Sequence, residues 1–112
     1  MTNRILSIKN DSDSAVSEAI RELKSGKPIV LPTDTVYGLG ALSSDIGAVD
    51  KIFEIKERSF RQPLPVLVAD FDQANEIAAF GSIPEAVKKF WPGPLTVIVP
   101  QRSEMSVYVG SE

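Results

Sequence analysis

A loop rich in hydroxyl and carboxyl groups is the first segment of this sequence that could bind a ligand. Ile29-Val30-Leu31 is an apolar run suited to a buried strand, and Pro32 closes it. The next residues, Thr33-Asp34-Thr35-Val36-Tyr37-Gly38-Leu39-Gly40, predict a loop. In open α/β sheets ligands bind beyond the carboxyl ends of strands, where this loop lies. The alternative is an Asx-turn, in which Asp34 and the threonines bond only to backbone amides.

A pair of cations forms the second candidate. Lys56 and Arg58 are two residues apart, so in an extended segment their side chains point the same way. If a helix ends near Lys56, both can face one anion, Arg as a planar fork and Lys as a point charge. The alternative is a basic helix end whose charges complement the helix dipole. Arg61 fits either interpretation.

A rigid segment, Trp91-Pro92-Gly93-Pro94-Leu95-Thr96, is the third candidate. Taken alone, it predicts a turn between a helix and a strand, with the tryptophan in the core.

Two absences exclude several kinds of chemistry. The 112 residues contain no Cys and no His, which excludes disulfides, thiolate nucleophiles, sulfur-ligated metals and Ser-His-Asp hydrolysis within the chain. The phosphate-loop pattern GxxxxGK[ST] does not occur, and Gly38-x-Gly40 lacks the third glycine of a dinucleotide fingerprint. A nucleotide site must therefore use another design. The net charge of −3 gives no global attraction for nucleic acid.

The composition is that of one ordinary globular domain, with 43% hydrophobic and 24% charged residues. No apolar run reaches the roughly 18 residues of a membrane span, and no signal-peptide pattern opens the sequence. We therefore expect a cytoplasmic protein that does not enter a membrane.

Helical and extended patterns alternate along the chain, which predicts an α/β layered domain. A first helix follows the polar cluster at 10–14 and stops at Gly26, and a second begins near Asp45. Two further strands are expected at 66–68 and 95–99. A helix capped by Asp72 should end at Gly81, and Pro84 should open the next. The predicted apolar faces are Val16, Ala19, Ile20 and Leu23; Ile46, Val49, Ile52 and Phe53; Ala74, Ile77 and Ala78; and Val87, Phe90 and Trp91.

Three strings of this sequence, taken in order, resemble the YrdC/TsaC family of L-threonylcarbamoyladenylate synthases. They are GKPIVLPTDTVYGLGA, IFEIKERSFRQPLPVLV and FWPGPLTVIVP, and the resemblance runs from about Ala15 to the C-terminus. It implies a twisted, open, mixed sheet with flanking helices around a positively charged cavity. The implied reaction joins L-threonine, bicarbonate and Mg²⁺-bound ATP into threonylcarbamoyl-AMP. A downstream tRNA threonylcarbamoyltransferase would use this product to modify tRNA.

The resemblance also implies roles for individual residues. Thr35 would contact threonine, with Thr33 and Tyr37 shaping its pocket. Lys56 and Arg58 match a KxR motif that holds the ATP phosphates, and they are the expected catalytic residues. Gln62 stands where relatives have a polar nucleotide contact, and Leu67 where many have His. No residue is expected to bind a metal directly, because Mg²⁺ would enter with ATP.

The family's later Ser-x-Asn motif has no counterpart in this sequence. Residues 107–112 also end on a strand-like pattern. We therefore expect residues 1–112 to be the first half of a YrdC-like domain with weak activity or none, and unpaired sheet edges that promote self-association.

Two other functions remain open. One is an RNA-binding module of the same fold, contacting tRNA or double-stranded RNA at the basic cavity. The other is the carbamoyltransferase-type domain of hydrogenase maturation, although that domain belongs to a much longer chain with zinc-finger segments, and this sequence has no Cys.

Overall fold

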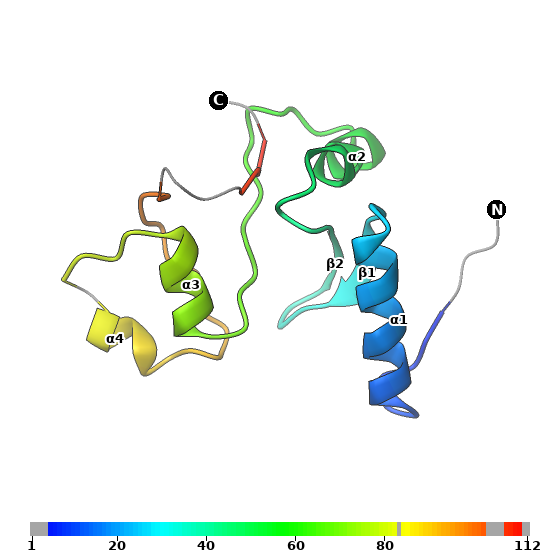
Figure 1. Cartoon of the computed structure of the whole chain (residues 1–112), viewed down its shortest axis with the longest axis horizontal. Coiled ribbons are helices and arrows are strands. Elements are labelled where there is room, and N and C mark those ends of the chain that lie inside the picture. Colours follow the sequence, from blue (N-terminus) through cyan, green and yellow to red (C-terminus); the bar gives the residue numbers. More distant parts are fainter. Residues whose placement is uncertain (1–4, 83, 103–106, 111–112) are drawn as a thin grey trace.

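The computed structural model describes residues 5–82, 84–102 and 107–110 of the chain. None of the helices in these ranges is long and apolar enough to cross a membrane. The elements follow the order α1 (Ser12–Lys24), β1 (Ile29–Pro32), β2 (Tyr37–Gly40), α2 (Ile46–Lys56), α3 (Phe71–Ile77) and α4 (Pro84–Lys88). Figure 1 shows α1 and α2 beside a small hairpin, with α3 and α4 farther away, and this combination of helices and strands confirms the predicted α/β class.

Each of the first two helices has an aspartate as its N-cap: α2 begins near Asp45 as predicted, whereas α1 begins inside the polar cluster at 10–14 and not after it. The side chain of Asp11 accepts a hydrogen bond from the amide of Ser14 at 3.1 Å. Asp45 accepts one from the amide of Ala48 at 3.0 Å. Each bond satisfies one of the amides that a helix start leaves without an intrahelical partner. After α1 the chain turns at Gly26, whose φ is +86°.

The predicted loop at 33–40 is wrong for its second half, which forms a strand. β1 and β2 are antiparallel, with Ile29 opposite Gly40 and Pro32 opposite Tyr37. Gly38 and Gly40 suggested a turn, but both lie in β2, opposite Leu31 and Ile29 of β1. A Cβ on Gly40 would lie 2.7 Å from Cδ2 of Leu31, so only glycine fits there without a shift of the leucine.

The sheet of the described residues consists of these two strands. The strand predicted at 29–31 forms but is not buried, since Val30 is 68% exposed. The strands predicted at 66–68 and 95–99 are wrong for the described ranges, where these residues belong to no helix, strand or bridge. An isolated bridge pairs Ala78 with Gln101.

Two separate apolar clusters stabilise the molecule. On α2, Val49, Ile52 and Phe53 are buried as predicted. Ala48 is buried as well, whereas Ile46 is 59% exposed and does not belong to the buried face. The other cluster contains Ala74, Phe80 and Val87, with Val97, Val99 and Trp91 packed against it. Figure 1 shows α3 and α4 set apart from α1 and the hairpin.

The second half of the chain corrects three predictions of detail. The cap of α3 is Asp70, whose carboxylate accepts from the amide of Gln73 at 2.8 Å, and Asp72 lies in the first turn. This helix ends before Ala78 and not at Gly81, because the amide of Ala79 bonds to the carbonyl of Pro100 at 2.8 Å. Phe90 is 62% exposed, whereas Val87 is buried as predicted.

Residues 107–110 bond to the segment before α2, to the middle of α2 and to the segment that follows it. The amide of Tyr108 donates to the carbonyl of Ser43 at 2.8 Å, and the amide of Leu64 donates to the carbonyl of Val109 at 3.0 Å. The Tyr108 hydroxyl donates to Oδ1 of Asp50 at 2.9 Å. The strand-like end predicted at 107–112 forms no strand at 107–110, and its last two residues lie outside the described ranges.

We expect Phe53→Ala to lower the free energy of unfolding by about 3–5 kcal/mol, because the ring is 1% exposed and its removal leaves a cavity. Phe90→Ala is the matched control, since that ring is 62% exposed and its loss should change the same quantity by about 0.5 kcal/mol or less. Urea unfolding of both variants is the measurement. Equal midpoints would contradict the assignment of Phe53 to the core.

Stability should also fall at high pH through Tyr108. The hydrogen bond to Asp50 raises the pKa of Tyr108 above its ordinary value of 10.0, and desolvation and the charge of Asp50 act in the same direction. The folded state therefore binds this proton more tightly than the unfolded state. The resulting stability is complete below about pH 10 and is lost as the pH rises through the raised pKa.

Thermal unfolding of the unchanged chain and of Tyr108→Phe, from about pH 8 to pH 12, measures this effect. The melting temperature of the unchanged chain should fall more steeply above about pH 10 than that of the variant. Parallel curves would show that Tyr108 titrates alike in both states.

Candidate substrate-binding site

Helix α2 ends in a Schellman motif that directs the following residues away from the helix axis. Glu57 has the left-handed φ of +51°. Its amide bonds to the carbonyl of Glu54 at 3.2 Å, and the amide of Arg58 bonds to the carbonyl of Phe53 at 2.9 Å. The predicted end of the helix at Lys56 is confirmed.

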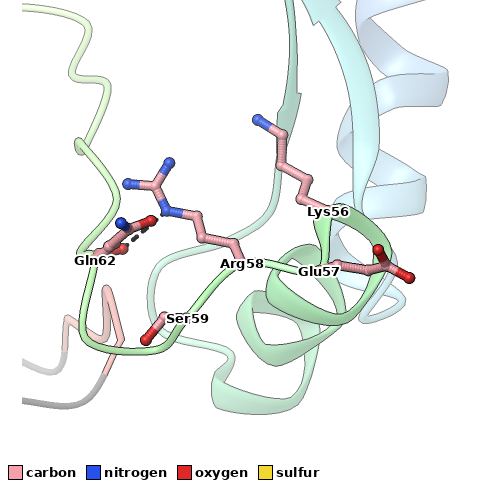
Figure 2. A pocket seen from close by; sticks show the side chains of 5 residues that line it. All are labelled: Lys56, Glu57, Arg58, Ser59 and Gln62. Carbon is pink, nitrogen blue, oxygen red and sulfur yellow. Dashed lines mark hydrogen bonds between the residues drawn. The ribbon is translucent and has the colours of Figure 1, made fainter.

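The loop after this motif borders an open hollow of about 480 Å³. In Figure 2 the side chains of Lys56 and Arg58 extend on the same side of the loop, while Glu57 points away from them. The left-handed residue between the two cations thus turns its carboxylate outward. The side chains that line the hollow are Lys56, Glu57, Arg58, Ser59 and Gln62.

Arg58 is held in place by its own loop. Its Nε donates to the carbonyl of Gln62 at 2.9 Å and its Nη2 to the carbonyl of Pro63 at 3.0 Å (Figure 2 shows the first of these bonds). A guanidinium has five N–H groups, so three remain for an anion. A turn supports the arrangement, because the amide of Gln62 donates to the carbonyl of Ser59 at 3.0 Å.

An aromatic contact anchors the same loop, and the sequence analysis did not anticipate it. The rings of Phe53 and Phe60 lie 4.8 Å apart. Gly110 packs against the backbone of Phe60 and the ring of Phe53. A Cβ at this position would lie 2.7 Å from the Phe60 carbonyl oxygen and 2.8 Å from Cζ of Phe53. Its φ of +122° also favours glycine. Fifty residues separate Phe60 from Gly110, so no local pattern could indicate this contact.

The hydroxyl-rich loop lies at the tip of the hairpin. The amide and the hydroxyl of Thr33 both donate to the carbonyl of Val36. The Thr33 hydroxyl also accepts from the amide of Val36 at 3.3 Å, which is the kind of bond that the alternative interpretation expected of the threonines. Thr35 and Tyr37 are exposed, Tyr37 by 75%. Within the described residues, none of these three side chains lines the hollow beside Arg58. Their assignment to threonine stays a prediction.

The third segment is a structural turn. The indole of Trp91 donates to the carbonyl of Leu95 at 3.0 Å, and its ring meets Phe80 edge-on with centroids 5.9 Å apart. Leu67 is 68% exposed. In the described part of the chain, no three His, Cys, Asp or Glu side chains form a group that could hold a metal ion.

Comparison with known sequences assigns the chain to a family. The Sua5/YciO/YrdC family model, described as telomere recombination, matches residues 21–111. The chain therefore belongs to this family.

The curated relatives are threonylcarbamoyl-AMP synthases. That of Pyrococcus abyssi is 45% identical over 83 residues, which are 70% of this chain and 24% of the relative. That of Bacillus subtilis is 40% identical over 80% of this chain and 26% of the relative. That of Psychromonas ingrahamii is 33% identical over 88% and 54%. The chain thus spans between a quarter and about half of these relatives.

Solved structures of the same family share the fold. A crystal structure of Pyrococcus abyssi Sua5 complexed with L-threonine has a TM-score of 0.77 and 36% identity, covering 94% of this chain and 29% of that one. A second Sua5 structure, with two substitutions, has a TM-score of 0.73 and 40% identity over 81% of this chain and 28% of that one.

Replacing Glu57 with glycine should stabilise the protein by about 0.5–1 kcal/mol, because glycine adopts the left-handed conformation without the penalty of a Cβ. Glu54→Gly is the matched control. It lies in the same helix three residues earlier and should destabilise by about 1 kcal/mol. Thermal unfolding measures both. A loss of stability in Glu57→Gly would contradict the motif described above.

Proposed function

We propose that this chain carries the binding surface for L-threonine and ATP of a threonylcarbamoyl-AMP synthase. One observation carries the proposal: Arg58 is fixed by two carbonyls of its loop and keeps three N–H groups for an anion beside Lys56. The likeness to a structure complexed with L-threonine supports threonine as a substrate, and the threonylcarbamoyl-AMP synthases among the relatives support the reaction as a whole.

The proposed reaction brings several anions together. The amine of threonine attacks bicarbonate, and a carbamate forms with loss of water. A carbamate oxygen then attacks the α-phosphorus of ATP, the bond to the β-phosphate oxygen breaks, and pyrophosphate leaves. Every partner after the amine is negatively charged, so the main barrier is electrostatic. Fixed cations lower it by holding the phosphates and by stabilising the charge that develops during transfer.

The residues of the loop divide these tasks. Arg58 presents a planar fork suited to two phosphate oxygens, and Lys56 adds a point charge on the same side of the loop. Gln62 offers its side-chain amide to the nucleotide from the same hollow. Mg²⁺ enters as part of the Mg-ATP substrate, and the phosphates supply its ligands.

Thr35 would receive the threonine substrate, with Thr33 and Tyr37 beside it. Because Thr33 already bonds to Val36, it acts through the shape of the turn. The product would pass to a tRNA threonylcarbamoyltransferase in the cytoplasm. No feature of the described residues favours the RNA-binding or the carbamoyltransferase alternative over this function.

Removal of the fork should weaken binding of Mg-ATP. A charge-assisted contact of this kind contributes roughly 1.5–3 kcal/mol, so Arg58→Ala should weaken affinity about 10- to 100-fold. Arg61→Ala is the matched control, since it removes the same charge from the same loop but does not line the hollow. Titration calorimetry measures the affinity, and pyrophosphate release with threonine and bicarbonate is followed in parallel.

Lys24→Ala is the matched control for Lys56→Ala. Each lysine is the last residue of its helix, so each substitution by alanine removes the same favourable interaction with a helix dipole. We expect Lys56→Ala to weaken Mg-ATP binding and Lys24→Ala to leave it unchanged. The proposed function would be overturned if each substitution in the hollow weakened Mg-ATP binding no more than its control does. It would also be overturned if the unchanged chain bound neither ATP nor threonine.

A further inference from the structure

Residues 107–110 contact the backbone of the loop that follows α2. The carbonyl of Val109 accepts the amide of Leu64 at 3.0 Å. Gly110 lies so close to the loop that a Cβ there would meet the carbonyl oxygen of Phe60 at 2.7 Å. Within the described ranges, none of the four residues lines the hollow itself. They therefore support the loop and do not form the surface where an anion would bind.

One peptide group links Val109 to the guanidinium of Arg58. The carbonyl of Pro63 accepts from Nη2 of Arg58 at 3.0 Å. The amide of Leu64 belongs to the same planar peptide group and donates to Val109. This peptide group is trans, so its C=O and its N–H point in opposite directions. A rotation of the plane that broke the bond to Val109 would also turn the carbonyl away from the guanidinium.

Residues 107–110 are themselves fixed to α2 and to the segment before it. The amide of Tyr108 donates to the carbonyl of Ser43 at 2.8 Å, and its hydroxyl donates to Oδ1 of Asp50 at 2.9 Å. All four residues are half-buried. Since α2 carries Lys56 as its last residue, the same helix presents one cation directly and supports the other through this segment. The segment thus relates the positions of the two cations.

We propose that residues 107–110 position the guanidinium of Arg58 for its anion. Val109 acts through the peptide group between Pro63 and Leu64, and not by contact with the anion. An arginine without this support would lose side-chain entropy each time it bound, so its affinity would fall. The inference rests on the proposed function for the identity of the anion, Mg-ATP.

Gly110→Ala is the first variant, and Gly81→Ala is its matched control. Both place alanine at a positive φ, of +122° and +64°, and so introduce the same kind of backbone strain. A Cβ at position 110 would meet Phe60 and Phe53, whereas a Cβ at position 81 meets nothing within 4 Å.

We expect Gly110→Ala to weaken Mg-ATP binding about 3- to 10-fold more than Gly81→Ala does, because the added Cβ displaces the segment from the loop. Titration calorimetry below the melting temperature of both variants is the measurement. Equal affinities of the two variants overturn the proposal.

A second pair of variants leaves the contact between Gly110 and the core unchanged. Asp50→Ala and Asp50→Asn both remove the carboxylate charge, but only asparagine keeps an oxygen that can accept the hydroxyl of Tyr108. The asparagine variant should therefore bind Mg-ATP at least about threefold more tightly than the alanine variant. If the two bind equally, the bond between Tyr108 and Asp50 does not position the loop, and the proposal is wrong.

A double substitution separates a positioning role from a merely structural one. If residues 107–110 act through the guanidinium, Gly110→Ala should have little further effect on Mg-ATP binding in a chain that already carries Arg58→Ala. A loss of the same size with and without the arginine would show that the segment supports the fold in general, which contradicts the proposal.

Hydrogen exchange of the Nε–H group of Arg58, followed by NMR without any ligand, distinguishes failure of this inference from failure of the proposed function. This group is bonded to the carbonyl of Gln62 at 2.9 Å. It should exchange at least about threefold faster in Gly110→Ala than in Gly81→Ala. Unchanged exchange overturns the inference even where the chain binds Mg-ATP. Faster exchange in a chain that binds no Mg-ATP upholds the positioning of Arg58 and overturns the proposed function alone.

Discussion

Phe53 is the residue on which the geometry of the candidate site depends. Its carbonyl accepts the amide of Arg58 and so closes the motif that ends α2. Its ring contacts Phe60 on the far side of the same loop, and Gly110 approaches both. One buried residue thereby fixes the loop at its start through its carbonyl and at its middle through its ring. The cations are exposed, but the backbone that presents them is anchored in the core.

Local interactions explain why helix boundaries could be predicted. An N-cap bond joins residues three apart, so the start of α2 near Asp45 could be predicted, while for α1 the sequence indicated only the polar cluster in which Asp11 is the cap. Around α3 two aspartates stand two residues apart, and either satisfies the local pattern. Asp70 is the cap and the amide of Gln73 its partner, a choice made by the extended backbone that precedes the helix. The sequence pattern does not show which of the two aspartates follows an extended backbone.

Strands and the remaining site residues depend on partners that are distant in the sequence. Gly40 is needed because Leu31 approaches it, and this contact exists only once β1 and β2 pair. The same limit applies to the loop of Arg58. The spacing of Lys56 and Arg58 predicted two cations on one side, since it is a property of three consecutive residues. The anchoring by Gly110 could not be predicted, because it joins segments fifty residues apart.

The absence of Cys and His explains why pre-organisation matters so much in this chain. Without a nucleophile or an imidazole base, the chain can assist the proposed reaction by placing charge and by excluding alternative geometries. A mobile arginine would lose side-chain entropy each time it met a phosphate, and that loss would reduce the binding energy. Two bonds from Arg58 to the carbonyls of Gln62 and Pro63 order the guanidinium beforehand. The loop thus uses two of five donors to orient the other three, which is the arrangement that electrostatic assistance of this kind requires.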